Sequence, residues 1–357
     1  MGIKSLSKFL KDNHNHLFET IHISQYRYKK VAIDMSLYLC HFKAAFQDGW
    51  FPAFIKFIAC FRENDIHPIP IYDGGYPVEK DNEKKDRQEA KEKLRGRILT
   101  IELALEKYES TGEIETSLLD FQKKKAGTQV SLLNKNKINT NLISYSLEKM
   151  KKQDFHLEKD DFESTKKLFD ILQIPYFTAP MEAETMGSDL CIRNQVDAVL
   201  SEDTDILAYG SPVFLTKFDS RTGLCVRIEY KKLLESFNFT PEQFLDFCIM
   251  CGTDYNNNIP RIGPSKAYKL ILEHKNIETV GSECKLDTTI LNHKRTRELF
   301  REYEISDKLK VPYCGFPDFK QLQIFFKIKN VNLNAEDLKK YFVQNENIII
   351  EEDELEN

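Results

Sequence analysis

Two acidic clusters stand out as residues that could do chemistry. Glu182 and Glu184 lie two positions apart, and about twenty residues later Asp203 and Asp205 repeat that spacing. Carboxylates this close in one pocket raise each other's pKa and stay ionised only where cations lie among them. The clusters contain no His or Cys, and oxygen-only ligands suit hard ions such as Mg²⁺. The pattern predicts a divalent-metal site, and such a site usually handles phosphate.

Three more acids occupy the same kind of position. Asp34 and Asp73 each end a short apolar segment, and Asp254 follows an expected helix over 244–250. If all seven acids converge, they can hold two metal ions about 4 Å apart, which suits phosphodiester hydrolysis by a water nucleophile. The alternative is that each acid caps a helix or faces solvent. That alternative explains one acidic pair well, but it explains seven acids at matching positions poorly.

The elements that carry these acids alternate between strands and helices. Strands are predicted over 29–34, 69–75 and 197–200, helices over 51–62, 160–172 and 182–194, and a hairpin over 213–217 and 225–228. Pro70 cannot donate to a ladder, so its strand either starts there or needs no N–H at that point. The alternation predicts an α/β sheet with its acids at the carboxyl ends of strands, where such sheets bind ligands.

The segment between Asp73 and Glu182 has a different composition. Residues 79–125 carry many charges of both signs, which predicts long solvated helices. Residues 127–146 are rich in polar residues, which predicts a loose insertion. Residues 346–357 form an acidic tail that we expect to be disordered.

Composition excludes several classes of protein. The 357 residues are 41% hydrophobic and 30% charged, and no apolar run approaches the length of a membrane span. The N-terminus has no signal-peptide pattern. The eight cysteines are scattered, which favours a reducing compartment. Cys248 and Cys251 form a lone CxxC, for which core packing is favoured over zinc or redox chemistry. The net charge of −5 means that any polyanion must bind local basic patches.

The segments around these acids resemble the XPG / flap endonuclease superfamily of structure-specific nucleases. The resemblance runs from residue 1 to about 275, interrupted by the charged segment. It rests on the opening Met1-Gly2-Ile3-x-x-Leu6 and on the segments 31–34, 72–74, 179–184, 202–205 and 251–255. It implies a PIN-like nuclease fold of the α/β class, with a mostly parallel central sheet flanked by helices. A helical arch insertion and a helix-two-turn-helix DNA-binding element would complete that fold.

The resemblance also assigns roles to particular residues. It implies that two Mg²⁺ ions, which Mn²⁺ can replace, are bound by all seven acids: Asp34, Asp73, Glu182, Glu184, Asp203, Asp205 and Asp254. Gly2 would place the chain end near the cleavage site. Lys80 and Arg87, seven and fourteen residues after Asp73, would act as catalytic clamps on the scissile phosphate. Arg95 and Arg97 fit solvated helix charges better than a role in the arch.

A second basic element follows Asp254. Residues 258–267 form a tight turn into a helix, where Pro264 suits the first helical position and Gly263 lets backbone amides approach a phosphate. The resemblance makes this the helix-two-turn-helix, with K⁺ as a further expected ion. The expected DNA contacts there are Gly263, Ser265, Lys266 and Lys269. Arg261 stands where the family usually has Gly, so it either adds a phosphate contact or alters the turn.

Other departures concern the substrate. Where flap endonucleases often carry a base-stacking aromatic, this chain has Cys40, and Tyr38 is the candidate substitute. Phe325 and Phe326 resemble part of a sliding-clamp peptide, but Phe319 occupies the place of its Gln. We therefore expect a packed helix and no clamp binding there.

The expected organisation has six parts. They are an N-terminal nuclease region over 1–110, the arch remainder and insertion over 111–155, an internal nuclease region over 156–230, the helix-two-turn-helix region over 231–280, a C-terminal helical region over 281–345, and a tail over 346–357.

The expected function is Mg²⁺-dependent hydrolysis of DNA at flaps or single-strand/double-strand junctions, by a monomer acting in replication or repair. The expected partner is branched or flapped DNA, with no membrane. The expected location is intracellular, in a nucleus or, for a viral protein, in the host nucleus or a cytoplasmic replication site. The alternatives are an mRNA-degrading nuclease of the same fold and a catalytically inactive protein that binds DNA structures.

Overall fold

The computed structural model describes residues 2–126, 138–301 and 309–342. The chain divides into two compact units. The sheet unit comprises Met1–Leu39, Phe51–Lys80 and Glu158–Asn357, and the helical unit comprises Cys40–Trp50 and Asp81–Leu157. Each unit is described separately below.

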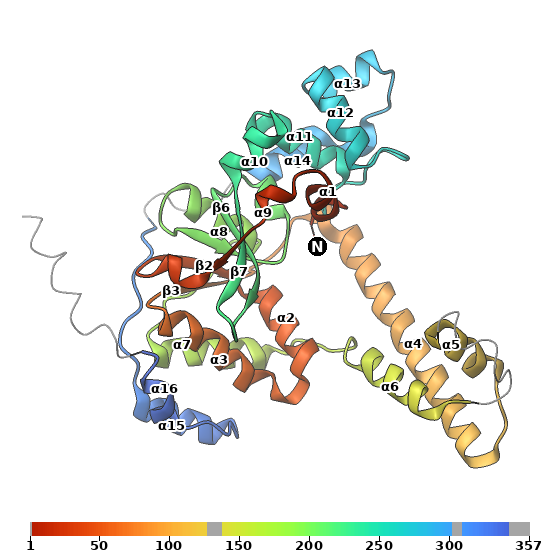
Figure 1. The fold of residues 1–357 in the computed structure, drawn as a ribbon, viewed down its shortest axis with the longest axis vertical. Coiled ribbons are helices and arrows are strands. Elements are labelled where there is room, and N and C mark those ends of the chain that lie inside the picture. Colours follow the sequence, from red (N-terminus) through yellow and green to blue (C-terminus); the bar gives the residue numbers. More distant parts are fainter. Residues whose placement is uncertain (1, 127–137, 302–308, 343–357) are drawn as a thin grey trace, which may run out of the picture. The chain divides into compact units, whose positions relative to one another are not determined.

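The sheet unit is built on a mixed sheet of seven strands in the order β1-β7-β6-β5-β2-β3-β4 (Figure 1). The strands are β1 (Glu19–His22), β2 (Lys30–Asp34), β3 (His67–Tyr72), β4 (Phe177–Thr178), β5 (Ala198–Leu200), β6 (Val213–Asp219) and β7 (Leu224–Glu229). Strands β4, β3, β2, β5 and β6 run parallel, whereas β7 and β1 add an antiparallel edge. This arrangement confirms the predicted fold class, including the hairpin of β6 and β7.

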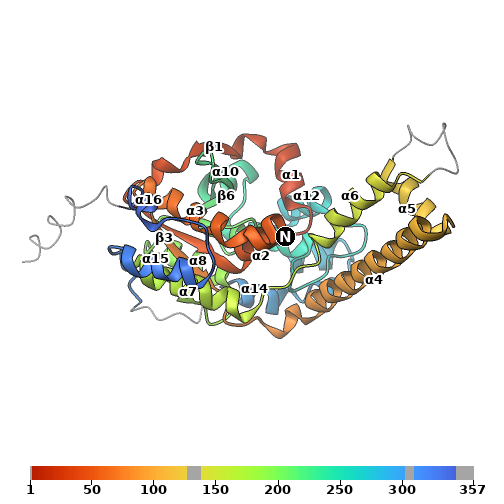
Figure 2. The same ribbon diagram turned by 90° about the horizontal axis from the view of Figure 1, so that it is seen from below.

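The central strands are apolar because both faces of the sheet are covered by helices (Figures 1 and 2). Val31, Ala32 and Ile33 of β2 are fully buried. Helix α8 (Ala183–Ile192) packs on β2, β3 and β5. Gly187 of α8 makes this packing close, since a Cβ there would lie 3.2 Å from Val199 of β5. Parallel strands bring their carboxyl ends to one edge, and the acids of the sequence follow those ends.

Strand β3 begins before Pro70, at His67. The His67 N–H donates to Lys29 on the β2 side, so the nitrogens of Pro68 and Pro70 face the opposite side of the strand. Strand β4 pairs with β3 only at Ile71 and Tyr72. The two prolines therefore lie where no backbone donor is needed, which is the second of the two expected placements.

The helices of the sheet unit surround this sheet and extend beyond it. They are α1 (Leu6–Asn13), α3 (Trp50–Glu63), α7 (Lys159–Leu172), α8, α9 (Asp205–Ala208), α10 (Tyr230–Phe237), α11 (Pro241–Cys251), α12 (Pro264–His274), α13 (Ile277–Glu283), α14 (His293–Arg301), α15 (Phe319–Ile328) and α16 (Ala335–Lys339). Helix α2 (Met35–Phe46) continues from β2 and, like α3, crosses the boundary between the units. Aromatic side chains join α3 to α7 through Phe54 and Phe169, with ring centroids 6.0 Å apart.

The C-terminal part behaves as the sequence predicted where it is described. Phe325 and Phe326 of α15 are buried, so this segment is a packed helix. The tail from residue 343 lies outside the described residues. No described helix is long and apolar enough to cross a membrane.

The helical unit contains α4 (Asp81–Thr111), α5 (Thr116–Ala126) and α6 (Thr140–Lys151). These helices are not merely solvated, because they bury a core of their own that includes Ile101, Phe121 and Leu147. The predicted loose insertion is wrong over 140–146, where α6 begins. Asn139 caps this helix by accepting the Leu142 N–H at 3.0 Å, so its polar residues are helix-start residues and not loop residues. Residues 127–137 lie outside the described part.

Candidate metal centre

The acids reach one site because each is held at the end of a short element. Asp34 is the last residue of β2, and Asp73 directly follows β3. Glu182 is the N-cap of α8 and Glu184 lies in its first turn, whereas Asp203 lies between β5 and α9 and Asp205 is the first residue of α9. Asp254 follows α11. The sheet thus positions the first six, and a helix end adds the seventh.

Three of these acids converge most closely. Asp203, Asp205 and Asp254 each place a carboxylate oxygen within 4.8 Å of the other two. Asp203 and Asp205 are 4% and 3% exposed. Burial and the neighbouring charges of Asp203 and Asp254 hold the pKa of Asp205 well above its usual range. Burial also raises the pKa of Asp203. Such a cluster is stable as an anion only beside cations.

Asp34 and Asp73 are held by donors of the chain itself. Asp34 accepts the Ser201 hydroxyl at 3.0 Å and the Leu37 N–H at 3.1 Å. Asp73 accepts the Ala183 N–H at 2.7 Å, which ties the end of β3 to the start of α8. Burial, followed by the charge of Asp73, raises the pKa of Asp34 to about 7.

Glu184 feels the charges of acids from several segments, Asp34 and Asp203 most strongly. Burial raises its pKa well above the usual range, and the charges of Asp34 and Asp203 raise it further. The structure therefore brings the four acids of the two sequence clusters within electrostatic range of one another. Asp34, Asp73 and Asp254, which are distant in sequence, belong to the same site.

Lys80 is the buried cation of this site. Its Nζ donates to Glu182 through a short contact and lies 3.2 Å from Asp254. Burial alone would lower the pKa of Lys80, but the nearby carboxylates raise it well above its usual range. Lys80 ends the 3₁₀ turn η4 (Val78–Lys80), so it precedes α4 and does not share a helix face with Arg87. Arg87 lies on α4 of the helical unit and pairs with Glu83.

The donor set fits a hard divalent ion. Oδ1 of Asp205 is buried and has no hydrogen-bond partner among the described residues. An orphaned buried carboxylate oxygen is costly unless a cation or a donor lies beside it. Asp203 and Asp254 each place a carboxylate oxygen within 4.8 Å of one from Asp205, so this cluster offers oxygen ligands without His or Cys. This chemistry suits Mg²⁺ or Mn²⁺ better than a soft metal.

Gly2 lies against this site for a steric reason. Its φ is +78°, and a Cβ added there would lie 2.0 Å from Oδ1 of Asp203 and 2.8 Å from Oδ1 of Asp205. The Lys4 N–H donates to the Gly252 carbonyl at 2.9 Å, which anchors this end of the chain beside the segment that carries Asp254. Any side chain at position 2 would collide with the carboxylates of Asp203 and Asp205, so only glycine fits there.

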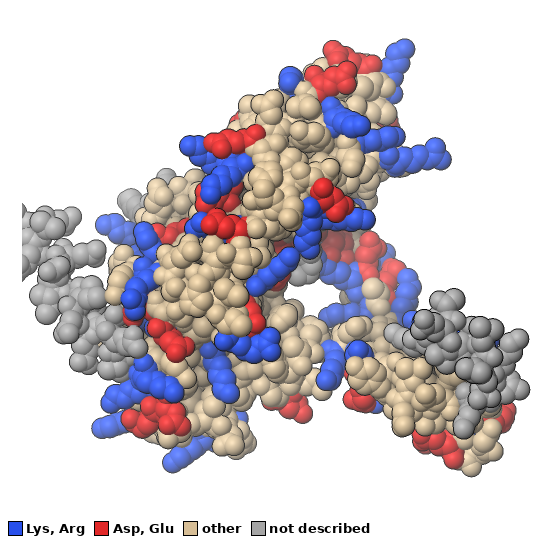
Figure 3. Space-filling view, in the orientation of Figure 1, with Lys and Arg blue, Asp and Glu red and all other residues tan. Residues whose placement is uncertain are grey.

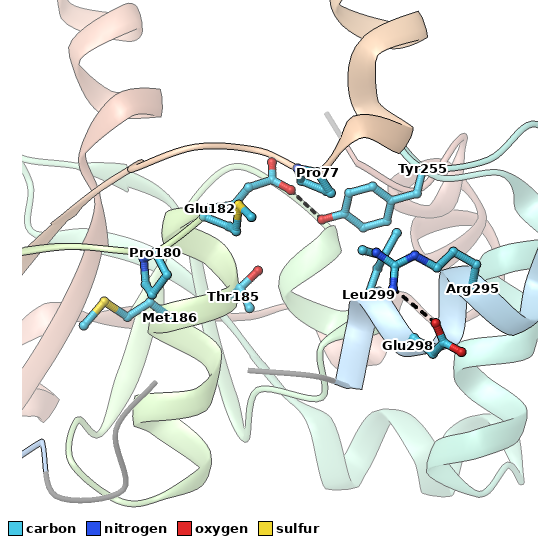
Figure 4. Close-up of a pocket in the computed structure, with 10 residues that line it drawn as sticks. Pro77, Pro180, Glu182, Thr185, Met186, Tyr255, Arg295, Glu298 and Leu299 are labelled. Atoms are coloured by element: carbon cyan, nitrogen blue, oxygen red, sulfur yellow. Dashed lines mark hydrogen bonds and ion pairs between the residues drawn. The ribbon is translucent and has the colours of Figure 1, made fainter. Parts of the chain in front are cut away.

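Two tyrosines that no sequence pattern had singled out complete the site. Tyr255 donates its hydroxyl to Glu182 at 2.5 Å, and the hydroxyls of Tyr209 and Tyr255 form a short hydrogen bond. Figure 4 shows Glu182 and Tyr255 facing each other at a pocket of about 130 Å³. Arg295, which also lines it, pairs with Glu79 at 2.7 Å and with Glu298 at 3.1 Å. The position of Tyr255 directly after Asp254 was the available signal.

The turn before α12 and the first turns of the helix carry exposed basic side chains. Gly263 is the N-cap of α12, and a Cβ there would meet nothing within 4 Å. Ser265, Lys266 and Lys269 are exposed. Arg261, which stands where a glycine was expected, has φ +66°, in the left-handed region that favours glycine. Lys and Arg side chains project from the surface around α12 (Figure 3).

Two sequence interpretations have a structural answer. The expectation that Tyr38 stacks on a base is wrong in this structure, because its ring is 4% exposed and packs on Phe57 with centroids 4.9 Å apart. Cys248 and Cys251 are 0% and 2% exposed in α11, and burial raises the pKa of both thiols. The core-packing interpretation of this CxxC is confirmed.

Comparison with known proteins agrees with this geometry. Residues 1–94 match the XPG N-terminal domain and residues 173–254 match the XPG I-region. The chain is 32% identical to a probable RAD2-like endonuclease (369L) of Invertebrate iridescent virus 6, over 96% of this chain and 92% of that protein. It is 28% identical to flap endonuclease 1 of Lodderomyces elongisporus, over 95% of this chain and 87% of that protein.

Solved structures share the fold. The catalytic core of Rad2 in complex with DNA substrate superposes with a TM-score of 0.66 at 17% identity, over 96% of this chain and 99% of that one. The two segments that match the XPG domains, residues 1–94 and 173–254, contain all seven acids and Lys80. The chain therefore belongs to the XPG family of structure-specific endonucleases, which includes the RAD2-like and flap endonucleases.

Proposed function

We propose that this chain hydrolyses DNA phosphodiesters at flaps or other single-strand/double-strand junctions, with Mg²⁺ as its cofactor. The observation that carries the proposal is the convergence of Asp203, Asp205 and Asp254 beside Lys80, with an orphaned buried oxygen on Asp205. A site that collects anionic ligands and one buried cation suits a phosphate group held through divalent ions. The DNA-bound Rad2 neighbour and the flap endonuclease relative favour DNA as the substrate.

The residues that would hold the ions are the seven acids. Asp203, Asp205 and Asp254 are the closest group, and Asp34, Asp73, Glu182 and Glu184 surround them through the contacts described above. When bound, two such ions supply Lewis acidity that generates the water nucleophile and offsets charge on the leaving oxygen. The backbone donors on Asp34 and Asp73 orient these two carboxylates before any ion binds.

Lys80 and α12 supply the contacts that ions do not. Lys80 is already charged and desolvated, so its ammonium can exchange a carboxylate for the scissile phosphate without first losing its water shell. The exposed start of α12 offers backbone amides, the helix dipole and Lys266 and Lys269 to the duplex phosphates. K⁺ at this turn and Arg87 as a second phosphate clamp remain part of the proposal.

The same proposal covers the cellular setting. Because the proposed substrate is DNA, we propose that the enzyme acts in a nucleus or, for a viral chain, in the host nucleus or at a cytoplasmic replication site. We propose that it acts as a monomer, because the sheet unit contains all seven acids and Lys80.

The test compares two double-substitution proteins on a labelled 5′-flap duplex in Mg²⁺. Asp203→Ala with Asp205→Ala removes two central ligands, and Asp12→Ala with Lys8→Ala removes exposed charges of α1 as the control. The first protein should bind the flap but cleave it at least about a thousandfold more slowly, whereas the control cleaves normally. Undiminished cleavage by the first protein would refute the assignment.

A single-stranded RNA substrate, run beside the flap, separates the remaining alternatives. Faster cleavage of the RNA than of the flap would replace DNA with RNA as the substrate class. Binding of the flap without cleavage by the wild-type protein, in either Mg²⁺ or Mn²⁺, would indicate an inactive DNA-structure-binding protein.

A further inference from the structure

A second group of reactive side chains lies in the pair of helices α12 and α13, which pack against each other. His274 is the last residue of α12, Glu283 is the last residue of α13, and Cys284 follows it. Sγ of Cys284 lies 3.2 Å from Nε2 of His274, and Nδ1 of His274 lies 2.6 Å from Glu283. The three groups form a relay in the order thiol, imidazole, carboxylate.

The tight turn between the helices creates this arrangement. Lys275 ends α12 in a left-handed conformation with φ +73°, and Asn276 caps α13 by accepting the Thr279 N–H at 2.8 Å. Ile277 and Val280 are buried, which fixes the inner face of α13. The end of α13 therefore turns toward the end of α12, where His274 is 13% exposed.

The geometry sets the roles of the two ring nitrogens. Nδ1 donates to the Glu283 carboxylate, so the tautomer with a free lone pair on Nε2 is favoured. Nε2 then faces the thiol and can take its proton, and the resulting imidazolium is stabilised by Glu283. Glu273 adds a second carboxylate 3.9 Å from Nε2. This is the nucleophile, base and orienting acid of covalent catalysis.

Access distinguishes Cys284 from most other cysteines of the chain. Cys60, Cys191, Cys225, Cys248, Cys251 and Cys314 are buried. Cys284 and Cys40 are the partly exposed ones, and Sγ of Cys284 lies 3.2 Å from Nε2 of His274. A thiol that is both reachable and beside a base meets the two requirements for reactivity.

We propose that Cys284 is a nucleophilic thiol and a site of oxidative or alkylating modification, activated by His274 and Glu283. With a peroxide, the sulfur attacks one oxygen, the S–O bond forms and the O–O bond breaks. The sulfur is oxidised to a sulfenic acid and the peroxide is reduced. The thiol proton passes through His274 to the leaving oxygen, so that the products are S–OH and water. This inference does not rest on the proposed nuclease function.

The first experiment measures labelling rates in the full-length protein. A limiting pulse of iodoacetamide, in which an S–C bond forms and iodide leaves, is followed by peptide mass spectrometry. Cys284 should label about tenfold faster than Cys40. Peroxide with a sulfenic-acid trap should mark the same peptide first. Equal labelling of Cys284 and Cys40 would overturn the proposal.

Variants separate activation from simple exposure. His274→Gln should slow labelling of Cys284 about tenfold, and Glu283→Gln should slow it by a smaller factor. His22→Gln is the matched control, because His22 also bonds a neighbouring hydroxyl, that of Ser24, but lies far from Cys284 in sequence. Labelling of Cys40 in every variant reports whether the fold persists.

Two further outcomes would contradict the proposal. An unchanged rate in both His274→Gln and Glu283→Gln would mean that exposure alone governs Cys284. Labelling that appears only after a chelator is added would mean that Sγ and Nε2 bind a metal ion, and that the pair is a ligand set and not a nucleophile with its base.

Discussion

Replacing Lys80 tests how much of the negative charge of the acidic site this side chain offsets before an ion binds. Lys80 donates to Glu182 and lies 3.2 Å from Asp254, and both acids belong to the proposed ligand set. An incoming ion must compete with this ammonium for the same oxygens. Lys80→Met keeps the length of the side chain and removes the charge, so we expect the variant to bind Mg²⁺ or Mn²⁺ more tightly than the wild type.

The magnitude follows from the interactions that the ion displaces. A hydrogen bond to a charged group contributes about 1.5–3 kcal/mol. If the ion displaces Lys80 from one of its two carboxylates, the variant avoids a cost of about 2 kcal/mol. That corresponds to roughly thirtyfold tighter binding. The metal-free variant should also be less stable, because removing one partner of a buried ion pair costs about 3–5 kcal/mol.

The assay is calorimetric titration of Mn²⁺ into the metal-free protein, with no DNA present, together with chemical unfolding of the same samples. Lys56→Met, at an exposed position of α3, is the control and should change neither quantity. Cleavage should fall in Lys80→Met while metal affinity rises, because the phosphate clamp is removed. Metal binding that is equal or weaker in Lys80→Met would show that Lys80 supports the ligands and does not compete for them.

Three other predictions concern separate parts of the sheet unit. Gly2→Ala should slow flap cleavage at least about tenfold and weaken Mn²⁺ binding, because the new Cβ would lie 2.0 Å from Asp203 in a left-handed conformation. Normal kinetics in this variant would remove Gly2 from the site. Lys266→Gln with Lys269→Gln should weaken binding of duplex DNA and lower the slope of log affinity against log salt by about 0.9 for each phosphate that the protein no longer neutralises, whereas Lys231→Gln on α10 should leave the slope unchanged. Burial, and then Arg62, lowers the pKa of His67 to about 3. As the pH falls, His67 is therefore protonated in the unfolded chain before it is protonated in the folded protein. The free energy of unfolding falls as the pH drops below about 6.5, by roughly 2–3 kcal/mol at pH 4.5. His67→Asn should flatten this dependence in chemical unfolding, and an unchanged dependence would refute it.

The convergence of the acids at strand ends could be predicted from the sequence because their positions follow from one rule. Parallel strands end at one edge, so apolar segments that end in Asp place those acids together. Asp34, Asp73 and the Asp203 segment obey this rule, and the structure brings them to one edge. The basis of the prediction is local, since each strand is short, apolar and closed by a polar residue.

What the sequence did not predict depends on contacts between distant residues. No spacing indicates that Tyr255 donates to Glu182, because the two residues lie 73 positions apart. Tyr38 looked available for stacking, yet packing on Phe57 buries it. Helix α6 was hidden because its cap and first two turns are rich in Asn, Thr and Ser. Its burial of Ile143 and Leu147 depends on α4 and α5, which the local pattern does not report.

The seven acids are not equivalent, and the difference between them indicates where a cation is needed. Asp34 and Asp73 are satisfied by donors of the chain, and Glu182 by Lys80 and Tyr255. Asp203 accepts the Asp205 N–H at 2.9 Å. Oδ1 of Asp205 lacks a partner within the described ranges, although it is buried next to two other carboxylates. A structure that gives Asp34, Asp73 and Glu182 donors of its own and leaves one buried oxygen of Asp205 without a partner among the described residues is organised for an ion at the centre. Asp205 is thus the acid whose replacement by Asn should cost most in metal affinity.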